Sequence, residues 1–314
     1  MRIVLLEPLG VAGEKILTLA KKLEDKGHEF VVYNDKPDNE GELIKRAAQA
    51  DIVILSNLPF SNDAISKCGN LKLISVAFTG IDHIGREACR KRGISVRNAA
   101  GYSTSSVAEL TFGLIISVLR NIPKCHDAVK EGKTGNGLAG FELAGKTLGI
   151  VGTGAIGLKV AEIGRAFGCK LVAYSRTEKV EARKIGVKYV SLDELLAGSD
   201  ILTLHVPLNE NTRGLISKEK VSLMKRGSIL INTARGPVVD SLALADALNE
   251  GRLAGAGIDV FDTEPPISPD HPLVRAKNVV LTPHIAFATK EALERRAEIA
   301  FDNVLSWMEK SNYE

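Results

Sequence analysis

Short apolar, β-branched runs alternate with longer helical patterns along this sequence, and that alternation restricts the possible folds most. In the first part of the chain the runs are IVLL (3–6), FVVY (30–33), DIVILS (51–56), LKLISVAF (71–78) and ISVRN (94–98). Amphipathic stretches such as 14–26 and 40–49 separate them. Runs that are apolar on both faces and alternate with helices predict a parallel sheet covered on both sides. We therefore expect a doubly wound α/β domain here.

The same alternation returns after the stretch 106–122, which is apolar nearly all round. Such a stretch predicts a buried helix that bridges two domains or packs at a subunit interface. The later runs, which predict a second parallel sheet, are KTLGIVG (146–152), KLVAYS (170–175), DILTLHV (200–206), SILINTA (228–234), GAGIDV (255–260) and NVVLTPH (278–284). A final helix is expected at about 289–309, with one apolar stripe formed by Leu293, Ala297, Phe301, Val304 and Met308. Periodicity does not say where this stripe packs.

Composition excludes several classes of protein. Apolar residues make up 45% of the chain and charged residues 25%, as in ordinary globular proteins. The net charge of +3 gives no electrostatic reason to expect nucleic acid or a membrane as partner. No CxxC pair occurs, so neither a metal site nor a disulfide framework is expected among Cys68, Cys89, Cys125 and Cys169. Because Met1 leads directly into a strand, no signal peptide is expected, and we predict a cytoplasmic protein.

The segment VGTGAIG (151–157) has glycines in G-x-G-x-x-G spacing between a strand and a helix. Gly152 permits a tight turn, Gly154 lets the backbone approach a pyrophosphate, and Gly157 allows close packing of helix on strand. In this context the spacing predicts a dinucleotide site rather than a structural turn. Two further residues of the turn belong to the predicted site: Ala155 and Ile156.

The strand after this helix bears on the choice of dinucleotide. NAD enzymes usually place Asp or Glu near its end, on the ribose 2′-hydroxyl. Here the strand ends in Ser175, Arg176 and Thr177, which suit a 2′-phosphate better. We therefore favour NADP, with NAD possible. In the alternative, Arg176 is a solvated loop residue and Glu178 serves the ribose.

Three polar side chains follow strands of the second predicted sheet. Arg235 lies in TARGPVVD, Glu264 in DVFDTEPP and His284 in LTPHIAFAT. A guanidinium directly after a buried strand is costly unless an anion meets it. Ligands of open α/β sheets bind at the carboxyl ends of the strands, so we expect these side chains to converge there. The alternatives are a structural ion pair for Arg235 and a packed ring for His284.

Several motifs, taken in order, resemble those of the D-isomer-specific 2-hydroxyacid dehydrogenases. They are FTGIDHI, NAAGYSTSSVAEL, ELAGKTLGIVGTGAIG, LHVPLNENTRGLI, MKRGSILINTARGPVVD, GAGIDVFDTEPP and NVVLTPHIA. The resemblance implies two doubly wound parallel-sheet domains with the active site in the cleft between them. One is a discontinuous, flavodoxin-like substrate domain of residues 1–99 plus 288–314. The other is a Rossmann NAD(P)-binding domain of residues 100–287.

The resemblance also gives the three polar residues their roles. Arg235 would hold the carboxylate of a 2-keto acid and polarise the adjacent carbonyl oxygen, which a planar fork of donors does well. His284 would exchange the proton, since an imidazole titrates near neutrality. Glu264 would be the partner that fixes the tautomer of this imidazole and favours its protonated form.

Further positions are assigned by the same resemblance. Thr79 and Gly80 match a loop whose backbone N–H groups bind the substrate carboxylate, and Leu58 would shape the pocket wall together with Phe60 and Phe78. Asp259 would face the nicotinamide carboxamide, and the His205 backbone would lie beside the adenosine. The remaining cofactor-lining positions are Thr104, Pro207, Thr212, Thr233, Ala234, His284 and Ala286.

The function implied is hydride transfer between NAD(P)H and a small 2-keto or 2-hydroxy acid, D-specific and similar to glyoxylate or hydroxypyruvate reductases. A homodimer is expected, with the helix 106–120 at its interface. The stretch GKTGNGLAGFEL lacks the tryptophan that family members often carry before the GKT strand, which leaves the substrate open. Two alternatives remain: a short phosphoglycerate dehydrogenase, and a dinucleotide-sensing scaffold similar to corepressors of this fold.

Overall fold

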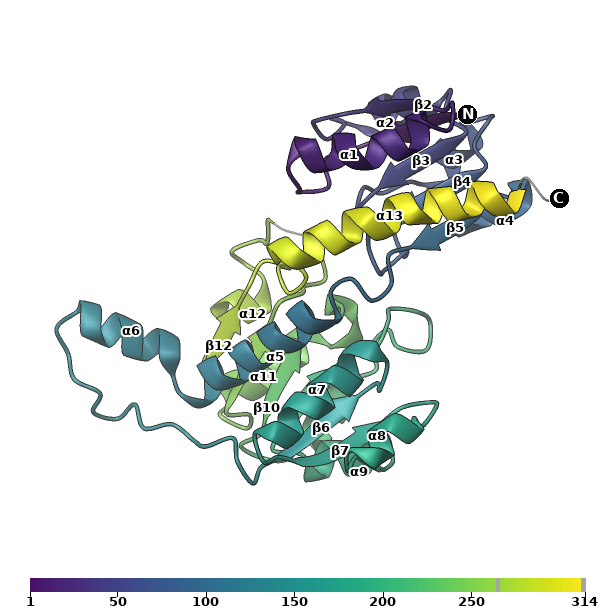
Figure 1. The fold of residues 1–314 in the computed structure, drawn as a ribbon. Coiled ribbons are helices and arrows are strands. Elements are labelled where there is room, and N and C mark those ends of the chain that lie inside the picture. The colour runs from purple at the N-terminus through teal and green to yellow at the C-terminus, as the bar shows by residue number, and fades with distance from the viewer. Residues whose placement is uncertain (264–265, 312–314) are drawn as a thin grey trace. The chain divides into compact units, whose positions relative to one another are not determined.

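The computed structural model describes residues 1–263 and 266–311. The chain forms two compact units, Met1–Ser103 with Ala288–Glu314 and, between these two stretches, Thr104–Phe287. The boundary falls at Ser103, whereas the resemblance implied residue 99. Each unit is built on its own parallel sheet (Figure 1). The predicted α/β class with two parallel sheets is therefore confirmed.

In its described part, the first unit has a five-stranded sheet with the order β2-β1-β3-β4-β5. Its strands, all parallel to their neighbours, are β1 (Arg2–Leu5), β2 (Glu29–Val32), β3 (Ile52–Leu55), β4 (Leu73–Val76) and β5 (Ser95–Asn98). Its helices are α1 (Gly13–Glu24), α2 (Glu40–Ala47), α3 (Asn62–Ser66), α4 (Arg86–Arg92) and α13 (Lys290–Ser311). The order reverses between β1 and β3, as in flavodoxin-like sheets.

Helix α13 brings a distant part of the sequence onto this sheet, and it runs beside α1 (Figure 1). Its buried side chains Ala297, Phe301 and Val304 share one apolar cluster with Ile3 of β1 and Ile54 of β3. The apolar stripe of the last helix, which periodicity could not place, thus belongs to the core of the first unit.

In its described part, the second unit has a seven-stranded sheet with the order β12-β11-β10-β9-β6-β7-β8. The strands, again parallel, are β6 (Thr147–Val151), β7 (Lys170–Tyr174), β8 (Lys188–Tyr189), β9 (Ile201–Leu204), β10 (Ile229–Asn232), β11 (Gly255–Ile258) and β12 (Val279–Leu281). The helices are α5 (Thr104–Leu119), α6 (Ile122–Lys130), α7 (Ala155–Ala166), α8 (Val180–Lys184), α9 (Leu192–Gly198), α10 (Lys218–Leu223), the short 3₁₀ helix η1 (Gly236–Val238), α11 (Ser241–Asn249) and α12 (Pro272–Arg275).

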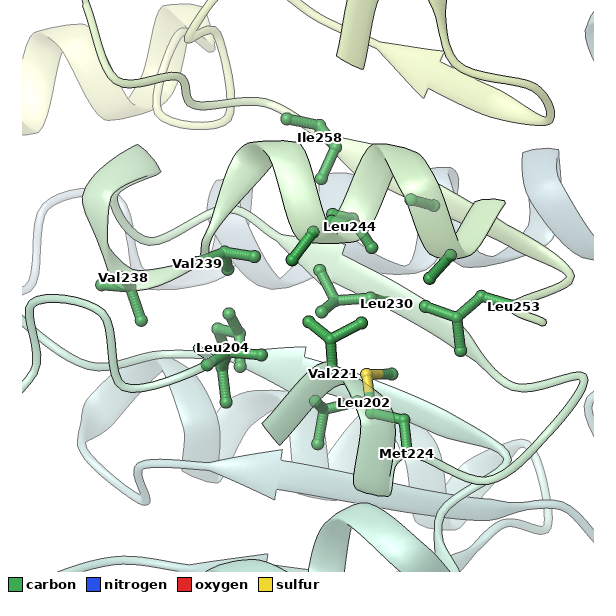
Figure 2. Close-up of a cluster of buried hydrophobic side chains, with 14 of the residues drawn as sticks. Leu202, Leu204, Val221, Met224, Leu230, Val238, Val239, Leu244, Leu253 and Ile258 are labelled. Carbon is green, nitrogen blue, oxygen red and sulfur yellow. The ribbon is translucent and has the colours of Figure 1, made fainter. Parts of the chain in front are cut away.

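Both faces of this second sheet are buried, because side chains alternate along each strand. On one face, Leu202 and Leu204 of β9 and Leu230 of β10 pack with Val221 of α10 and Leu244 of α11 (Figure 2). On the opposite face, the intervening strand residues pack with α5 and α7. This arrangement explains why the strand runs are apolar throughout.

The buried helix predicted for the stretch 106–122 is present as α5, but it ends at Leu119. Asn121 has a φ of 51°, in the left-handed region, and the helix breaks there into α5 and α6. Most apolar side chains of α5 are buried against α7 and the sheet of its own unit, so the pattern needs no second subunit to explain it. Helix α6 has no buried residue and extends away from the sheet (Figure 1).

Among the described residues, no single helix combines the length and apolar character needed to cross a membrane. Helices α5 and α6 meet those two criteria only as a pair, and they are bent by 60° at the break between them.

Candidate active site

The turn between β6 and α7 requires glycine for reasons visible in the structure. Gly152 has a φ of 93°, and a Cβ there would lie 2.5 Å from the carbonyl oxygen of His205. A Cβ on Gly157 would lie 1.9 Å from the carbonyl oxygen of Gly152. A Cβ on Gly154, in contrast, would meet nothing within 4 Å. Neighbouring backbone therefore excludes side chains at 152 and 157, whereas the approach to residue 154 is open.

Helix α7 begins directly after this open position. Gly154 is its N-cap and provides no side-chain cap, and Ala155 and Ile156 form the first turn. Uncapped N–H groups at a helix N-terminus attract anions. The turn and the first residues of α7 thus fit the pyrophosphate of a nicotinamide dinucleotide. The nicotinamide of such a cofactor, when bound, would supply a hydride.

The loop after β7 carries the residues that were predicted to choose between NAD and NADP. Arg176 and Thr177 are exposed, and Ser175 is half-buried. The carboxylate of Glu178 forms an ion pair with Arg183. The Oε2 atom of Glu178 is thus engaged by this guanidinium.

Tyr189 links this loop to the glycine turn, a role that the sequence analysis missed. Its hydroxyl donates to Thr153 Oγ1 at 2.8 Å and accepts from the backbone N–H of Lys179 at 2.9 Å. The guanidinium of Arg183 lies 5.3 Å from the centre of the Tyr189 ring. One aromatic side chain therefore joins the two segments on which the dinucleotide prediction rests.

Next to this turn, His205 directly follows strand β9. A hydrogen bond of 2.9 Å joins His205 Nε2 and Thr203 Oγ1, and among the described residues Nδ1 has no partner. Burial lowers the pKa of His205 to about 3, so its ring is neutral at physiological pH. In the same loop, Thr212 Oγ1 donates to the Pro207 carbonyl oxygen at 2.5 Å, which closes the turn between them.

The segment after β10 is held by local hydrogen bonds. The Asn232 side chain donates to the carbonyl oxygen of Arg235 at 3.0 Å and accepts from the N–H of Ala234 at 3.0 Å. Arg235 Nη1 donates to the Ala234 carbonyl oxygen at 2.8 Å. Thr233 lies behind them, with its hydroxyl 3.1 Å from that of Thr111 on α5. The backbone that carries the guanidinium is thus fixed before any substrate binds.

Asp259, just beyond β11, is fully buried. Its Oδ1 accepts from Thr282 Oγ1 at 2.6 Å and from the N–H of Ile285 at 2.9 Å, and its Oδ2 accepts from the N–H of Ala286 at 2.9 Å. Its carbonyl oxygen accepts from the N–H of His284 at 2.7 Å. Both oxygens of this side chain therefore have partners in the loop after β12, and its contact with the nicotinamide carboxamide stays a prediction from the resemblance.

That loop holds His284 in an uncommon conformation. Its φ is 56°, which few residues other than glycine adopt. The His284 ring lies edge-on to Phe287, with centroids 5.7 Å apart. Thr104, another predicted cofactor position, is the first residue of α5. Glu264, the predicted partner of His284, lies outside the described residues.

The predicted substrate positions Leu58, Thr79 and Gly80 belong to the first unit, in the loops after the neighbouring strands β3 and β4. Asn98 Nδ2 donates to the Thr79 carbonyl oxygen at 2.6 Å. Glu7 Oε1 accepts from the N–H of Leu58 at 3.1 Å. The sequence analysis missed Glu7, although an acidic residue directly after an apolar strand was a usable signal.

Within the second unit, the structure therefore gathers residues that are far apart in the sequence. Arg235, Asp259 and His284 follow β10, β11 and β12, which are consecutive neighbours in the sheet. The loops touch, since a Cβ on Gly236 would lie 1.9 Å from the Phe261 carbonyl group. A guanidinium and an imidazole thus follow strands of the sheet that also carries a glycine turn suited to a dinucleotide, an arrangement typical of oxidoreductases that transfer hydride.

Comparison with known proteins identifies the family. Residues 112–286 match the model of the D-isomer specific 2-hydroxyacid dehydrogenase, NAD binding domain. The glyoxylate reductase of Aeropyrum pernix is 40% identical over 299 residues, which cover 92% of this chain and 89% of that protein. The hydroxypyruvate reductase of Blautia hydrogenotrophica is 36% identical over 298 residues, covering 93% and 92%. The chain belongs to the D-isomer-specific 2-hydroxyacid dehydrogenase family, as its motifs indicated.

Solved structures agree with this assignment. An acyclic imino acid reductase in complex with NADPH and D-Arg superposes with a TM-score of 0.89 and 31% identity, covering 99% of this chain and 98% of that one. The D-lactate dehydrogenase of Aquifex aeolicus, complexed with NAD and lactic acid, superposes with a TM-score of 0.85 and 34% identity, covering 99% and 96%. The second unit thus contains an NAD(P)-binding domain, and these neighbours include complexes of both dinucleotides.

Proposed function

We propose that this protein reduces a small 2-keto acid, such as glyoxylate or hydroxypyruvate, to the D-2-hydroxy acid with NAD(P)H as hydride donor. The observation that carries the proposal is the placement of Arg235 and His284 after β10 and β12, on either side of the strand that precedes Asp259. The names of the relatives agree with this substrate class.

Arg235 provides the grip on the substrate in this proposal. Two parallel N–H donors bind the carboxylate of the keto acid, and a donor beside the C2 carbonyl stabilises the negative charge that develops on its oxygen. A lysine ammonium presents no planar fork and cannot serve both groups in this way. The Asn232 bonds to the backbone of residues 234 and 235 preorganise this guanidinium.

His284 provides the proton. In the reductive direction a protonated ring nitrogen of His284 donates to the C2 oxygen as hydride reaches C2, which leaves a neutral imidazole and a hydroxyl group. In the oxidative direction the neutral ring accepts that proton. Glu264, in its family role, favours the imidazolium and orients the ring.

We assign the remaining predicted residues to the two units in the same way. The first unit is the substrate domain, in which Thr79, Gly80 and Leu58 meet the keto acid. The second unit binds the dinucleotide through the glycine turn and the first turn of α7.

The test is a panel of 2-keto acids with NADH and NADPH, followed by the absorbance of the reduced nucleotide. We expect turnover with at least one small keto acid and a loss of kcat/KM of about 10²-fold or more in Arg235→Ala. Arg226→Ala, an exposed arginine on the turn before β10, is the matched control and should keep full activity. Absence of turnover with every acid and both nucleotides would refute the proposal.

For the cofactor, we propose a preference for NADPH. The support is an exposed Arg176 between two hydroxyl residues and the engagement of Glu178 with Arg183. Arg176→Ala should lower kcat/KM for NADPH about tenfold, because a charged hydrogen bond to phosphate contributes about 1.5–3 kcal/mol. The same variant should leave kcat/KM for NADH nearly unchanged. A wild-type preference for NADH would overturn this assignment.

We also propose that two copies of the chain form a homodimer through α6 and not through α5. In α6, Ile122 is 47% exposed and Val129 76% exposed, and a nine-residue helix without packed side chains is marginal in water. Sedimentation should give a dimer for the wild type and a monomer for Val129→Asp. A wild-type monomer would contradict the proposal.

A further inference from the structure

A cluster of buried polar side chains lies at the carboxyl edge of the first unit, where the strand order reverses between β1 and β3. In open α/β sheets this crevice is where ligands bind. Glu7 follows β1 and Ser56 follows β3, and Arg296 of α13 donates to Ser56 and to the Leu9 carbonyl oxygen in the loop after β1. We call Glu7, Ser56 and Arg296 the switch-point cluster.

Glu7 fixes the backbone after β3. Its side chain is 1% exposed, and its Oε1 accepts from the N–H of Ser56 at 2.7 Å and from the N–H of Leu58 at 3.1 Å. Its Oε2 lies 3.8 Å from the ammonium of the exposed Lys36. A carboxylate that accepts from the N–H groups of residues 56 and 58 restricts the conformation of this short segment.

Arg296 of α13 holds the same segment through the Ser56 side chain. It is 5% exposed, and its Nη1 donates to Ser56 Oγ at 3.0 Å. Its Nη2 donates to the Leu9 carbonyl oxygen at 2.7 Å. The guanidinium carbon lies 6.0 Å from the centre of the Tyr102 ring. One side chain of the last helix thus joins the loop after β1 to the loop after β3.

Stability alone gives little reason to keep such a cluster. Burial lowers the pKa of Arg296, whereas Tyr102 and Glu7 raise it, and an arginine stays charged in either case. A buried charge costs several kcal/mol in desolvation, and replacing buried ionic groups by apolar ones of similar size is often neutral or stabilising. What an apolar replacement cannot do is fix the N–H groups and the hydroxyl of residues 56–58.

We propose that Glu7 and Arg296 are positioning residues that hold residues 56–60 in the conformation that receives the keto acid. The inference rests on the proposed function, in which Leu58 meets the substrate. Neither side chain touches the substrate; both act through the backbone and through Ser56. Their loss should therefore raise KM for the keto acid and leave the binding of NADPH unchanged, because the second unit binds the nucleotide.

The first experiment compares Arg296→Met and Arg296→Lys with a matched control, Arg46→Met. Arg46 is also buried, at 7% exposed, but it donates to the carbonyl oxygens of Leu6 and Asp35 and to the carboxylates of Asp35 and Glu42, and to no residue of 56–60. We expect Arg296→Met to raise KM for the keto acid about tenfold or more, with kcat within about threefold and the Kd of NADPH unchanged. Arg296→Lys keeps a cation and should fall between Arg296→Met and wild type, and Arg46→Met should keep the wild-type KM.

A second pair of variants, Glu7→Gln and Glu7→Leu, separates the hydrogen bonds that the Glu7 side chain accepts from the volume that it fills. Glu7→Gln retains an oxygen that can accept both N–H bonds, so its KM should stay near that of wild type, whereas Glu7→Leu should raise KM. Equal effects of Arg296→Met and Arg46→Met, or an unchanged KM in both Arg296→Met and Glu7→Leu, would overturn the proposal.

Amide hydrogen exchange tests the same claim without any turnover. Exchange at Ser56 and Leu58 should accelerate in Glu7→Leu and Arg296→Met and stay as in wild type in Arg46→Met. Unchanged exchange in the first two variants would refute the positioning role. A wild-type protein without keto-acid turnover would instead refute the proposed function, and the exchange measurement would still decide how residues 56–58 are held.

Discussion

The two sheets expose their carboxyl edges in the same way, yet the loops at these edges are held by different means. In the first unit, charged side chains do this work, and the most distant of them, Arg296, comes from the last helix. In the second unit, backbone meets backbone at glycines, as at Gly152, Gly157 and Gly236. Charged groups hold a loop through directed hydrogen bonds, whereas close backbone contact holds it by leaving no room for a side chain. The edge of the second unit therefore depends mainly on positions where no side chain fits, although the first unit has one such contact too, between Gly85 and the backbone of Asn62.

The largest expected effect on stability comes from adding one carbon atom at a close backbone contact of the second unit. In Gly236→Ala the new Cβ would lie 1.9 Å from the Phe261 carbonyl group, so one of the two loops must move. We expect a loss of about 3 kcal/mol in the free energy of unfolding, measured with urea. Gly154→Ala is the matched control, because a Cβ there meets nothing within 4 Å, and it should change stability by less than about 0.5 kcal/mol. Similar losses in both variants would break the comparison.

Side chains also hold loops of the second unit, as Asn232 does after β10 and Asp259 does in the loop after β12. Asp259→Asn has only one oxygen to accept the bonds from Thr282, Ile285 and Ala286, and its amide hydrogens would face a donor. We expect kcat to fall about 10- to 100-fold because the His284 loop shifts, with little change in the Kd of NADPH. Thr282→Val, which removes one of the three bonds, should lose less. An effect confined to nucleotide binding would instead favour contact with the nicotinamide carboxamide.

The neutral ring of His205 makes the stability of the second unit depend on pH. The folded-state pKa is lowered to about 3 from the ordinary 6.5, so the unfolded state binds more protons between these values. Its contribution is therefore fully present above about pH 6.5 and is lost as the pH falls toward 3, at up to about 1.4 kcal/mol per pH unit. His205→Gln should flatten the decline of Tm between pH 6.5 and 5. Parallel Tm profiles of variant and wild type would show that this ring does not contribute.

The smallest effect concerns the link between the glycine turn and the loop after β7. Tyr189→Phe removes the hydroxyl bonds to Thr153 and to the N–H of Lys179. Loss of a hydrogen-bonded hydroxyl is worth about 1 kcal/mol, so the Kd of NADPH should rise about fivefold. Nucleotide fluorescence titration measures this change, with KM for the keto acid as the internal control. An unchanged Kd would mean that the turn is held by its glycines alone.

Pattern and spacing predicted the two sheets because both of their faces are buried, which leaves continuous apolar runs such as those of β3 and β9. The glycine turn was equally predictable from the sequence, because the spacing of its glycines has a direct steric cause. The break at Asn121 was missed, although Pro123 two residues later cannot continue a helix and was a usable signal. Periodicity also did not predict the tertiary partners of Glu7 and Arg296. Arg296 lies on a polar position of the last helix, and periodicity did not say which residues this helix contacts.

The backbone of His284 limits how its chemistry can be dissected. At a φ of 56°, β-branched residues are strained, while asparagine is among the few side chains found there routinely. His284→Asn thus removes the ring and spares the loop, so its rate would report on proton transfer alone. A valine at 284 would mix that loss with a displaced main chain, and the same steric filter narrows what natural variation can place there.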